Sequence, residues 1–253
     1  MWTIRHLTQT RSTNDDAAAL LGTPESAGTV IVADVQTAGR GRHERAWVAE
    51  ANTSLLCTAI LPQPIATASL WAVPFWTGLA LADSVEATTG LSATLQWPND
   101  LLIAGAKCAG ILCISRVIGA RAHVGCGTGV NVRRPADGAA YAAVTPAPAF
   151  LSDRADDVTP ASVLDALLAA YARRLGELDD PNGVARAWER RAELDGTPYR
   201  LLVDGTTNPI EVTARAIGAD GALIVDHAGE RRAIALADAR VLRDPLFRTG
   251  PAG

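Results

Sequence analysis

The chain has 253 residues, of which 48% are hydrophobic and 20% charged, and its formal net charge is −4. This apolar content is enough for the core of one large domain, or of a large and a small one. No run approaches the roughly 18 apolar residues of a membrane span, and the N-terminal segment lacks the apolar centre of a signal peptide. The mildly acidic balance argues against non-specific nucleic-acid binding. Composition therefore predicts a soluble globular protein of the cytoplasm without a membrane partner.

Four cysteines lie far apart in the sequence and mostly within apolar runs. Neither a C-x-x-C pair nor a histidine at metal-ligand spacing accompanies Cys57, Cys108, Cys113 or Cys126. This pattern predicts buried, reduced thiols instead of disulfides or a zinc site.

The first half of the chain predicts one mixed β-sheet with packed helices. A helix is expected at residues 12–22 and a longer one at 69–89, with Pro74 in its first turn. Strands are expected at residues 28–35, 53–61, 91–103 (interrupted by Pro98), 105–118 and 123–132. Because strands follow one another after a helix, the pattern favours an α+β fold over a regularly alternating, doubly wound one.

A long loop and two helices are expected next. Residues 133–153 are rich in Ala, Pro and Gly without any period, which predicts a surface loop and candidate lid over a site. Helices are expected at 160–178, where Thr159 precedes Pro160 as a cap, and at 181–194.

The C-terminal part changes to short alternating strands, at 199–205, 210–218, 222–229 and 231–242. Such a succession predicts a small β-barrel. We therefore divide the chain into a large domain at residues 1–195, a small β-domain at 196–243 and a flexible tail at 244–253.

The segment QTAGRGRHERAW, residues 36–47, places arginines in one glycine-punctuated loop. Glycines let backbone amides approach a ligand, and guanidinium groups bind carboxylate or phosphate as rigid forks. The loop therefore predicts an anion clamp built on Arg40, Arg42 and Arg45, with a solvated turn or an RNA-contacting segment as the alternatives. Trp47, which closes the loop, is either a core anchor or a surface on which a purine stacks.

A second group lies in LQWPNDLLIAGAKCAGIL, residues 95–112. Lys107 interrupts an apolar run and has little to pair with locally. It is either an ordinary turn lysine or an ammonium inside a cleft, where its charge neutralises an anion most effectively. Gly110 would let a ligand lie against the backbone. Asp100 would pair with Lys107, hold Mg²⁺ or cap the turn.

Two further motifs stand on either side of this group. In VGCGTGVNV, Gly125, Gly127 and Gly129 alternate along a predicted strand, so one face of the strand carries no side chains. Either another backbone crosses there or a flat ligand lies on the strand, and the spacing differs from the G-x-G-x-x-G fingerprint. In RSTND, residues 11–15, the polar side chains alone would make a helix cap.

The motifs occur in the order S-T-N, Q-x-A-G-R-G-R-x-x-R-x-W, W-P-N-D, K-x-A-G-I-L and G-x-G-V-N, between Ser12 and Asn131. This order resembles the biotin protein ligases, also called biotin–[carboxylase] ligases. The small β-barrel expected after Gly196 is similar to the family's C-terminal SH3-like domain. The resemblance implies a mixed-sheet catalytic domain of the class II synthetase and biotin ligase type. Lipoate ligases share that fold but usually carry a different Arg- and Gly-rich signature.

The resemblance implies a two-step reaction with ATP as co-substrate, Mg²⁺ as the metal and no prosthetic group. The biotin carboxylate attacks the α-phosphate of ATP, giving biotinyl-5′-AMP and pyrophosphate, and a carrier-domain lysine then displaces AMP. The implied partner is the biotin carrier domain of acetyl-CoA carboxylase or a related carboxylase. A lipoate or octanoate ligase on the same fold and a non-catalytic biotin-sensing module are the alternatives.

By the same resemblance, Lys107 would bridge the biotin carboxylate and the α-phosphate, Arg40 and Arg42 would hold the phosphate, and Asp100 would position nucleotide or metal. The implied biotin-binding residues are Ser12, Thr13, Asn14, Gln36, Gly39, Arg40, Lys107, Gly110 and Gly127. The implied ATP-binding residues are Arg40, Arg42, Arg45, Trp47 (facing the adenine), Asn99, Lys107 and Asn131. Mg²⁺ is expected to be held mainly by the phosphates, with Asp100 as the candidate protein ligand.

The chain departs from the family pattern at His43 and Glu44, where Arg-Gly is usual, and at Gln96, where a lysine is common. These changes remove positive charge, so we expect weaker retention of the adenylate. Because Ser12 stands so near the N-terminus, neither a winged-helix domain nor specific DNA binding is expected. The family includes monomers and sheet-to-sheet dimers, and a homodimer stays open.

Overall fold

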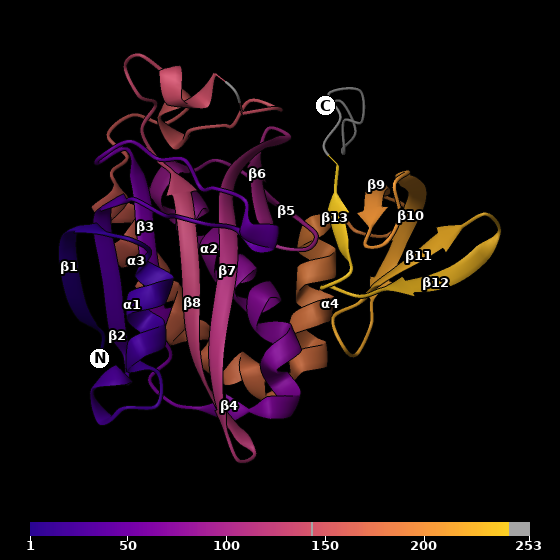
Figure 1. Ribbon diagram of the computed structural model, residues 1–253, viewed down its shortest axis with the longest axis horizontal. Helices are drawn as coiled ribbons and strands as arrows, with labels where there is room; N and C mark the ends of the chain where they lie inside the picture. Colours follow the sequence, from indigo (N-terminus) through magenta and orange to yellow (C-terminus); the bar gives the residue numbers. More distant parts are fainter. Residues whose placement is uncertain (143, 243–253) are drawn as a thin grey trace.

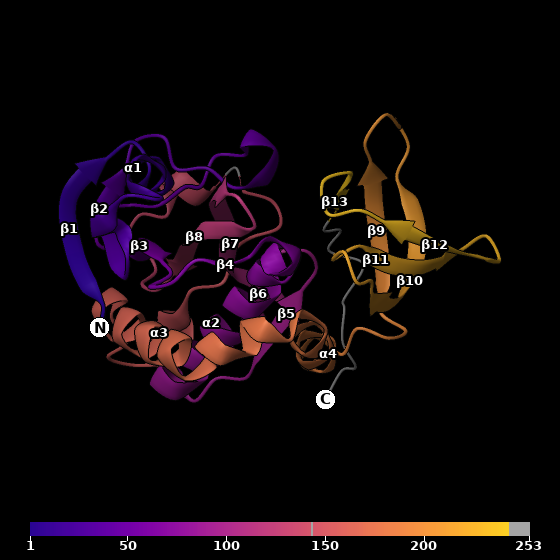
Figure 2. The same cartoon turned by 90° about the horizontal axis from the view of Figure 1, so that it is seen from below.

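The computed structural model describes residues 1–142 and 144–242. A large and a small β-sheet stand side by side (Figures 1 and 2). The large sheet has eight strands in the order β1-β2-β3-β8-β7-β6-β5, with the short β4 paired to β8. They are β1 (Thr3–Thr10), β2 (Thr29–Gln36), β3 (Ser54–Ile60), β4 (Ile65–Ala66), β5 (Ala93–Gln96), β6 (Asp100–Ile103), β7 (Ala106–Ile118) and β8 (Arg121–Asn131).

The large sheet is mixed, as predicted for an α+β fold. β1 and β2 are parallel, and the other neighbours are antiparallel. The prediction missed β1, because this edge strand is mostly exposed and has no apolar run to mark it. The interruption predicted at Pro98 divides the run at 91–103 into β5 and β6. Residues 97–99 form a turn there, and the flanking strands pair as a hairpin.

Helices cover both faces of the large sheet (Figure 2). The helix α1 (Thr13–Leu20) lies on one face, while α2 (Val73–Thr89) and α3 (Pro160–Arg174) lie on the other. The rings of Trp76 and Tyr171 stack between α2 and α3 with a centroid distance of 4.8 Å. Both side chains are fully buried, so this contact contributes aromatic area to the core that holds these helices together.

The helix predictions are confirmed, with small differences at the ends. Pro74 lies in the first turn of α2, and Gly90 ends that helix in the left-handed conformation at φ 68°. The Thr159 side chain accepts a hydrogen bond from the backbone N–H of Ser162, which caps α3. Beyond α3 the chain continues as a 3₁₀ helix over Leu175–Asp179.

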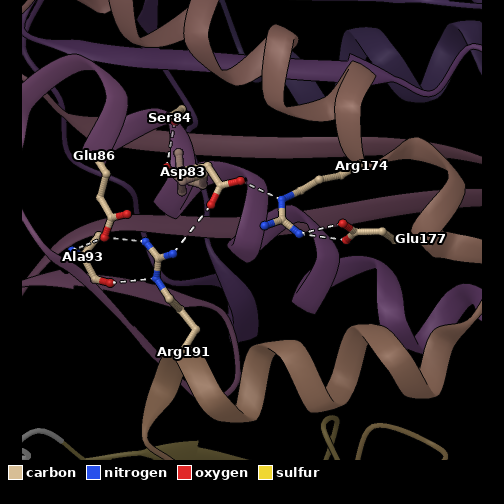
Figure 3. A network of polar contacts seen from close by, with 8 residues as sticks. Asp83, Ser84, Glu86, Ala93, Arg174, Glu177 and Arg191 are labelled. Atoms are coloured by element: carbon tan, nitrogen blue, oxygen red, sulfur yellow. Dashed lines mark hydrogen bonds and ion pairs between the residues drawn. The ribbon is translucent and has the colours of Figure 1, made fainter.

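Ion pairs tie α4 (Pro181–Ala192) to the other helices (Figure 3). Asp83 of α2 accepts a hydrogen bond from Nε of Arg174 at 2.8 Å and lies 3.6 Å from Nη1 of Arg191. Arg191 also pairs with Glu86 at 2.5 Å. Because the carboxylates of α2 bind arginines from both α3 and α4, the network fixes the helix that leads into the small sheet.

The small sheet has five antiparallel strands in the order β12-β11-β10-β9-β13. They are β9 (Pro198–Val203), β10 (Ile210–Ile217), β11 (Leu223–His227), β12 (Glu230–Ile234) and β13 (Ala239–Val241). The run predicted at 231–242 divides into β12 and β13. Within residues 1–142 and 144–242, these end strands do not pair with each other. The predicted closed barrel is therefore not present in the strand pairing, because the three-residue β13 pairs with β9 alone.

Direct hydrogen bonds join the two parts of the chain. The backbone N–H of Trp97, in the β5–β6 turn, donates to the hydroxyl oxygen of Tyr199 at 3.2 Å. The backbone N–H of Ile217 donates to the Glu189 carboxylate of α4 at 2.6 Å. The small sheet is thus anchored to both the large sheet and the last helix.

The prediction of reduced cysteines is confirmed, since all four are free and three are buried. Burial raises the pKa of the Cys57 and Cys108 thiols to about 12. Among the described residues, every helix is too short or too polar to cross a membrane. The predicted tail at 244–253 lies outside the described residues.

Candidate active site

A cleft with a cavity volume of about 380 Å³ lies on the α1 side of the large sheet. Its walls come from the start of α1, the loop at 39–47, strands β6 to β8, residues 141, 144–146 and 148, and strand β13. Every predicted site residue except Gly39 lines it: Ser12, Thr13, Asn14, Gln36, Arg40, Arg42, Arg45, Trp47, Asn99, Asp100, Lys107, Gly110, Gly127 and Asn131. The structure thus brings motifs that are spread over 120 positions into one site.

Glycines of β7 and β8 form the floor of the cleft. Gly110 and Gly129 are cross-strand neighbours, and the Trp47 ring covers both. A Cβ atom at Gly129 would lie 2.7 Å from the Trp47 ring, and one at Gly127 would collide with the Asn14 side chain. The Trp47 ring, the Asn14 side chain and the Leu112 carbonyl lie against these glycines, and the two alternatives predicted for this strand, a crossing backbone or a flat ligand, stay predictions.

At the α1 end, polar side chains bond to one another. Gln36 Oε1 accepts hydrogen bonds from the backbone N–H of Thr13 at 2.7 Å and from its hydroxyl at 3.1 Å. Thr58 Oγ1 lies 2.9 Å from the Thr13 hydroxyl and 2.7 Å from Asn14 Oδ1. The Asn14 amide donates to the Leu112 carbonyl at 3.0 Å. These bonds fix the amide and hydroxyl groups in place before any ligand binds.

Sequence reasoning missed Thr58, which is fully buried at the centre of this network. Its place is set by register, because Thr58 on β3 pairs with Gly127 on β8. A threonine within an apolar strand is a weak signal, but its position opposite a glycine of the floor would have singled it out once the pairing was known.

Lys107 reaches the cleft because β7 carries a bulge. Leu101 pairs with Ala109 and Leu102 pairs with Lys107, so Cys108 is the extra residue. In a regular strand, residues 107 and 110 would point to opposite faces. With the bulge, Lys107 Nζ lies 3.3 Å from the position that a Cβ of Gly110 would take.

The Lys107 side chain is partly buried, and its ammonium is paired. Its Nζ lies 2.6 Å from Asp100 Oδ1, as one of the predicted alternatives requires, and 5.5 Å from the centre of the Trp47 ring. Burial, and secondly the positive charge of Arg45, lower the pKa of Lys107 to about 8. The neighbouring Asp100 carboxylate favours the charged form. Lys107 therefore carries its charge at neutral pH and loses it under mildly alkaline conditions.

The loop at 39–47, which we call the clamp loop, is folded as a closed hairpin. The backbone N–H of Gly41 donates to Arg45 at 2.7 Å, and that of Trp47 donates to Gly39 at 2.8 Å. At its turn, His43 and Glu44 adopt positive φ angles of 52° and 54°. This left-handed region favours glycine, so the two residues that depart from the family pattern also carry backbone strain.

The clamp arginines have different partners. Arg40 forms an ion pair with Asp15 of α1, whose hydrogen bond is the main cause of the lowered pKa of that carboxyl. Arg45 is exposed. Arg42 donates to the backbone carbonyl of Leu236, close to β13. The loop thus contacts α1 near its base, through Arg40, and the small sheet near its turn, through Arg42.

The two asparagines predicted to bind ATP bond to backbone groups of the cleft wall. The Asn99 amide donates to the Ile111 carbonyl at 2.7 Å, and the Ile111 N–H donates back to the Asn99 carbonyl at 2.9 Å. The buried Asn131 amide donates to the carbonyl of Ala149 at 3.2 Å. These contacts hold the β5–β6 turn and the loop at 133–153 against the cleft.

The loop at 133–153 reaches the cleft, as its prediction as a lid requires. Tyr141, Val144, Thr145, Pro146 and Pro148 line the cavity. These residues were not among the predicted site residues, because a proline- and alanine-rich stretch has no motif that marks them. Their contribution to the wall is mainly apolar.

The described residues contain no group of three or more His, Cys, Asp or Glu side chains placed to hold a metal ion. Asp100 is the acidic residue in the part of the cleft wall that the structure describes. A single carboxylate suits Mg²⁺ that is carried mainly by substrate phosphates, and does not suit a metal held by protein ligands alone.

Comparison with known proteins shows the family. The model of the biotin/lipoate A/B protein ligase family matches residues 7–131. The biotin–[acetyl-CoA-carboxylase] ligase of Paracoccus denitrificans is 34% identical over 239 residues, which cover 92% of this chain and 98% of that protein. This chain belongs to the biotin/lipoate A/B protein ligase family. Another ligase, the bifunctional ligase/repressor BirA of Bacillus spizizenii, is 34% identical over 127 residues, covering 50% of this chain and 39% of that protein.

Solved structures of biotin protein ligases share the fold at lower identity. The biotin protein ligase from Aquifex aeolicus in complex with biotin and ATP covers 96% of this chain and 100% of that chain, with a TM-score of 0.74 and 22% identity. The ligase from Leishmania major in complex with biotinyl-5-AMP covers 92% and 98%, with a TM-score of 0.62 and 21% identity. These coverages extend the shared fold over most of the small sheet.

Proposed function

We propose that this family member is a biotin–[acetyl-CoA-carboxylase] ligase, which activates biotin with ATP and transfers it to a lysine of a carboxylase biotin carrier domain. The observation that carries the proposal is the 34% identity to the Paracoccus denitrificans ligase across 98% of that protein. The cleft supports it chemically, because a partly buried ammonium and a polar pocket lie at neighbouring positions in one cavity of about 380 Å³.

In the first step, the biotin carboxylate oxygen forms a bond to the α-phosphorus of ATP, and the bond to the leaving pyrophosphate breaks. Two anions must approach each other, so fixed positive charge lowers the barrier. We assign this role to Lys107, whose burial strengthens its interaction with both reacting groups. Asp100 keeps the ammonium protonated and oriented through its contact at 2.6 Å.

We assign the ureido and ring end of biotin to the polar pocket at the start of α1. Ser12, Thr13, Asn14 and Gln36 lie there, and the network through Thr58 holds the last three in fixed positions. Preorganised donors and acceptors suit a neutral, hydrogen-bonding group better than an anion. Backbone contacts from Gly110 and Gly127 to biotin stay a prediction, since the Trp47 ring and the Asn14 side chain lie against these glycines in this structure.

We assign the ATP end to the clamp loop. Arg40, oriented by Asp15, and Arg45 supply positive charge for the phosphates, and Asn99 and Asn131 hold the walls. Stacking of Trp47 on the adenine stays a prediction. Its position on the glycine floor, 5.5 Å from Lys107, supports a place near the reacting carboxylate. Mg²⁺ would arrive on the ATP phosphates, with Asp100 as its candidate protein ligand, and no step here depends on it.

In the second step, the carrier lysine amine attacks the acyl carbon of biotinyl-5′-AMP, and AMP leaves. A closed clamp loop would exclude water from the anhydride until the carrier arrives.

We propose a division at residue 195, with the catalytic domain before it and an SH3-like domain at 196–243. The order of the five strands supports this relation to SH3-like folds, although β12 and β13 remain unpaired with each other.

The proposal is tested by incubating the chain with ATP, Mg²⁺ and a carboxylase carrier domain, in parallel with biotin, lipoate and octanoate. Intact mass spectrometry of the carrier should show one biotinyl group, absent when the acceptor lysine is replaced by arginine. Transfer of lipoate or octanoate in preference to biotin would assign the chain to the other branch of the family. Absence of any transfer would contradict the ligase proposal.

A further inference from the structure

The turn at residues 97–99 joins β5 to β6 and leads directly into the cleft. Pro98 and Asn99 line the cavity, and the next residue, Asp100, lies 2.6 Å from Lys107 Nζ. The two strands pair up to the ends of the turn, so a shift of the turn backbone would move Asp100 with it. The position of this turn therefore sets the position of the carboxylate beside the ammonium.

Only one side of the turn is held from within the large sheet. Asn99 and Ile111 exchange two hydrogen bonds there, at 2.7 and 2.9 Å. At the other side stands Trp97, which is fully buried and follows β5, the edge strand of the large sheet. In the part of the chain that the structure describes, no strand of this sheet lies beyond β5 to accept from the Trp97 N–H. A buried N–H without an acceptor is costly, so the turn requires a partner from elsewhere.

The partner comes from the small sheet. Tyr199 of β9, 102 positions further along the chain, accepts the Trp97 N–H on its hydroxyl oxygen at 3.2 Å. Burial raises the pKa of this phenol, which therefore stays neutral and keeps its hydroxyl. In both views β5 and β6 lie on the side of the large sheet that faces the small one (Figures 1 and 2). A side chain of one sheet thus completes the hydrogen bonding of a turn in the other.

The packing around Tyr199 makes this hydrogen bond important. A second cavity, of about 390 Å³, lies between β5 and the small sheet, and its walls include Leu95, Gln96 and Tyr199. Space beside a ring leaves van der Waals contacts unmade, so packing confines the ring less than a filled core would. The hydrogen bond therefore defines the distance between the small sheet and the turn.

We infer that Tyr199 is a positioning residue for adenylation, whose hydroxyl holds the turn at 97–99 so that Asp100 keeps its place beside Lys107. The inference rests on the proposed function, because the rate of adenylation reports on this pair of residues. Tyr199 lies outside the part of the cleft wall that the structure describes, so it acts through the turn and not by touching substrate. The small sheet then contributes to chemistry in a cleft whose floor belongs to the large sheet.

A double-mutant cycle tests whether Tyr199 acts through Asp100. Single-turnover formation of biotinyl-5′-AMP is measured for the wild type, Y199F, D100N and Y199F/D100N, with saturating biotin and with enzyme in excess over labelled ATP. Y199F should slow the step about 3- to 10-fold, the usual loss for one hydrogen bond, while the Kd for biotin stays within about twofold. In the D100N background, Y199F should change the rate less than about twofold. Because enzyme is in excess, a smaller folded fraction alone leaves this rate constant unchanged.

A second link between the small sheet and the large domain supplies the matched control. Glu189 of α4 accepts from the Ile217 N–H at 2.6 Å, and this link ends on a helix instead of the turn. E189A removes it and should leave the adenylation rate within about twofold of the wild type. Amide hydrogen exchange at Trp97 should be faster in Y199F and unchanged in E189A.

Three results would overturn the inference. They are a wild-type rate in Y199F, equal losses in Y199F and E189A, and effects of Y199F and D100N that multiply as independent changes. Absence of adenylate formation in the wild type would instead refute the proposed function.

Discussion

At the α1 end of the cleft the polar side chains form hydrogen bonds with one another. At the β13 end Arg42 donates to a backbone carbonyl and feels the charge of the more distant Asp204. Thr13, Gln36, Thr58 and Asn14 form one continuous hydrogen-bonded set. Arg240, by contrast, has a buried Nε without a partner in the described structure. The first arrangement suits recognition of a neutral shape, and the second suits capture of charge.

The two ends of the cleft also differ in the elements that support them. The α1 end packs on central strands of the large sheet, where Gly127 pairs with both Thr58 and Leu112. The β13 end is formed by a three-residue edge strand and by the turn of the clamp loop, which has two positive φ angles. We therefore expect substitutions at the first end to change acid binding, and those at the second end to change nucleotide binding and release.

The largest effect is expected where the two ends meet, at Lys107. K107A should slow adenylate formation about 100- to 1,000-fold, because a buried fixed charge at the reacting atoms is lost. Rapid-quench measurement of biotinyl-5′-AMP gives the rate. K107R, which keeps the charge, should retain more activity than K107A, and equal losses in both variants would mean that charge is not the decisive property.

A methyl group added at Gly127 should weaken biotin binding at the α1 end of the cleft more than ATP binding. G127A places a Cβ against Asn14, and overpacking of this kind should weaken biotin binding about 10- to 100-fold. Isothermal titration with biotin alone measures the change. G176A is a matched control, since a Cβ there meets nothing within 4 Å. An equally large rise in the KM for ATP would contradict the division of the cleft into a biotin-binding end and a nucleotide-binding end.

The ion pair of Lys107 and Asp100, which lies between the two ends of the cleft, should determine how adenylation depends on pH. Lys107 must be protonated to act, and its pKa is lowered to about 8, so adenylation should decline as the pH rises through that value. D100N removes the carboxylate that favours the charged form and should move the alkaline limb to lower pH. A limb that stays in place in D100N would show that another group sets it.

The smallest effect is expected at the clamp turn. H43R/E44G restores positive charge and a glycine at a position with φ 54°, and should slow dissociation of the adenylate about two- to fivefold, the range of one exposed charge. Stopped-flow fluorescence with excess unlabelled ligand measures the rate. E44G alone separates backbone relief from charge. If the adenylate dissociates from H43R/E44G at the wild-type rate, His43 and Glu44 do not weaken its retention.

Much of this site could be predicted from the sequence, because short motifs carry its chemistry. The clamp arginines, Lys107, Asp100 and the alternating glycines were recognisable by residue type and spacing, and the structure brings all of them except Gly125 into one cleft. The mixed sheet and the helices followed from apolar runs and caps in the same way. What these features share is that each depends on neighbours close in sequence.

The remainder depends on contacts between distant segments. The bulge at Cys108 that turns Lys107 into the cleft is a matter of strand register, and no residue type marks it. Thr58 becomes part of the site only through its pairing with Gly127. Arg240 reaches the cavity only because the small sheet docks beside it. Each of these requires tertiary structure to be known first.

The central claim, that one cleft joins a biotin-binding end to a nucleotide-binding end through Lys107, is tested most directly by ATP–pyrophosphate exchange in the wild type and K107A. We expect exchange that requires biotin, is not supported by lipoate, and is nearly lost in K107A while biotin still binds. Exchange without biotin, or full exchange in K107A, would contradict it.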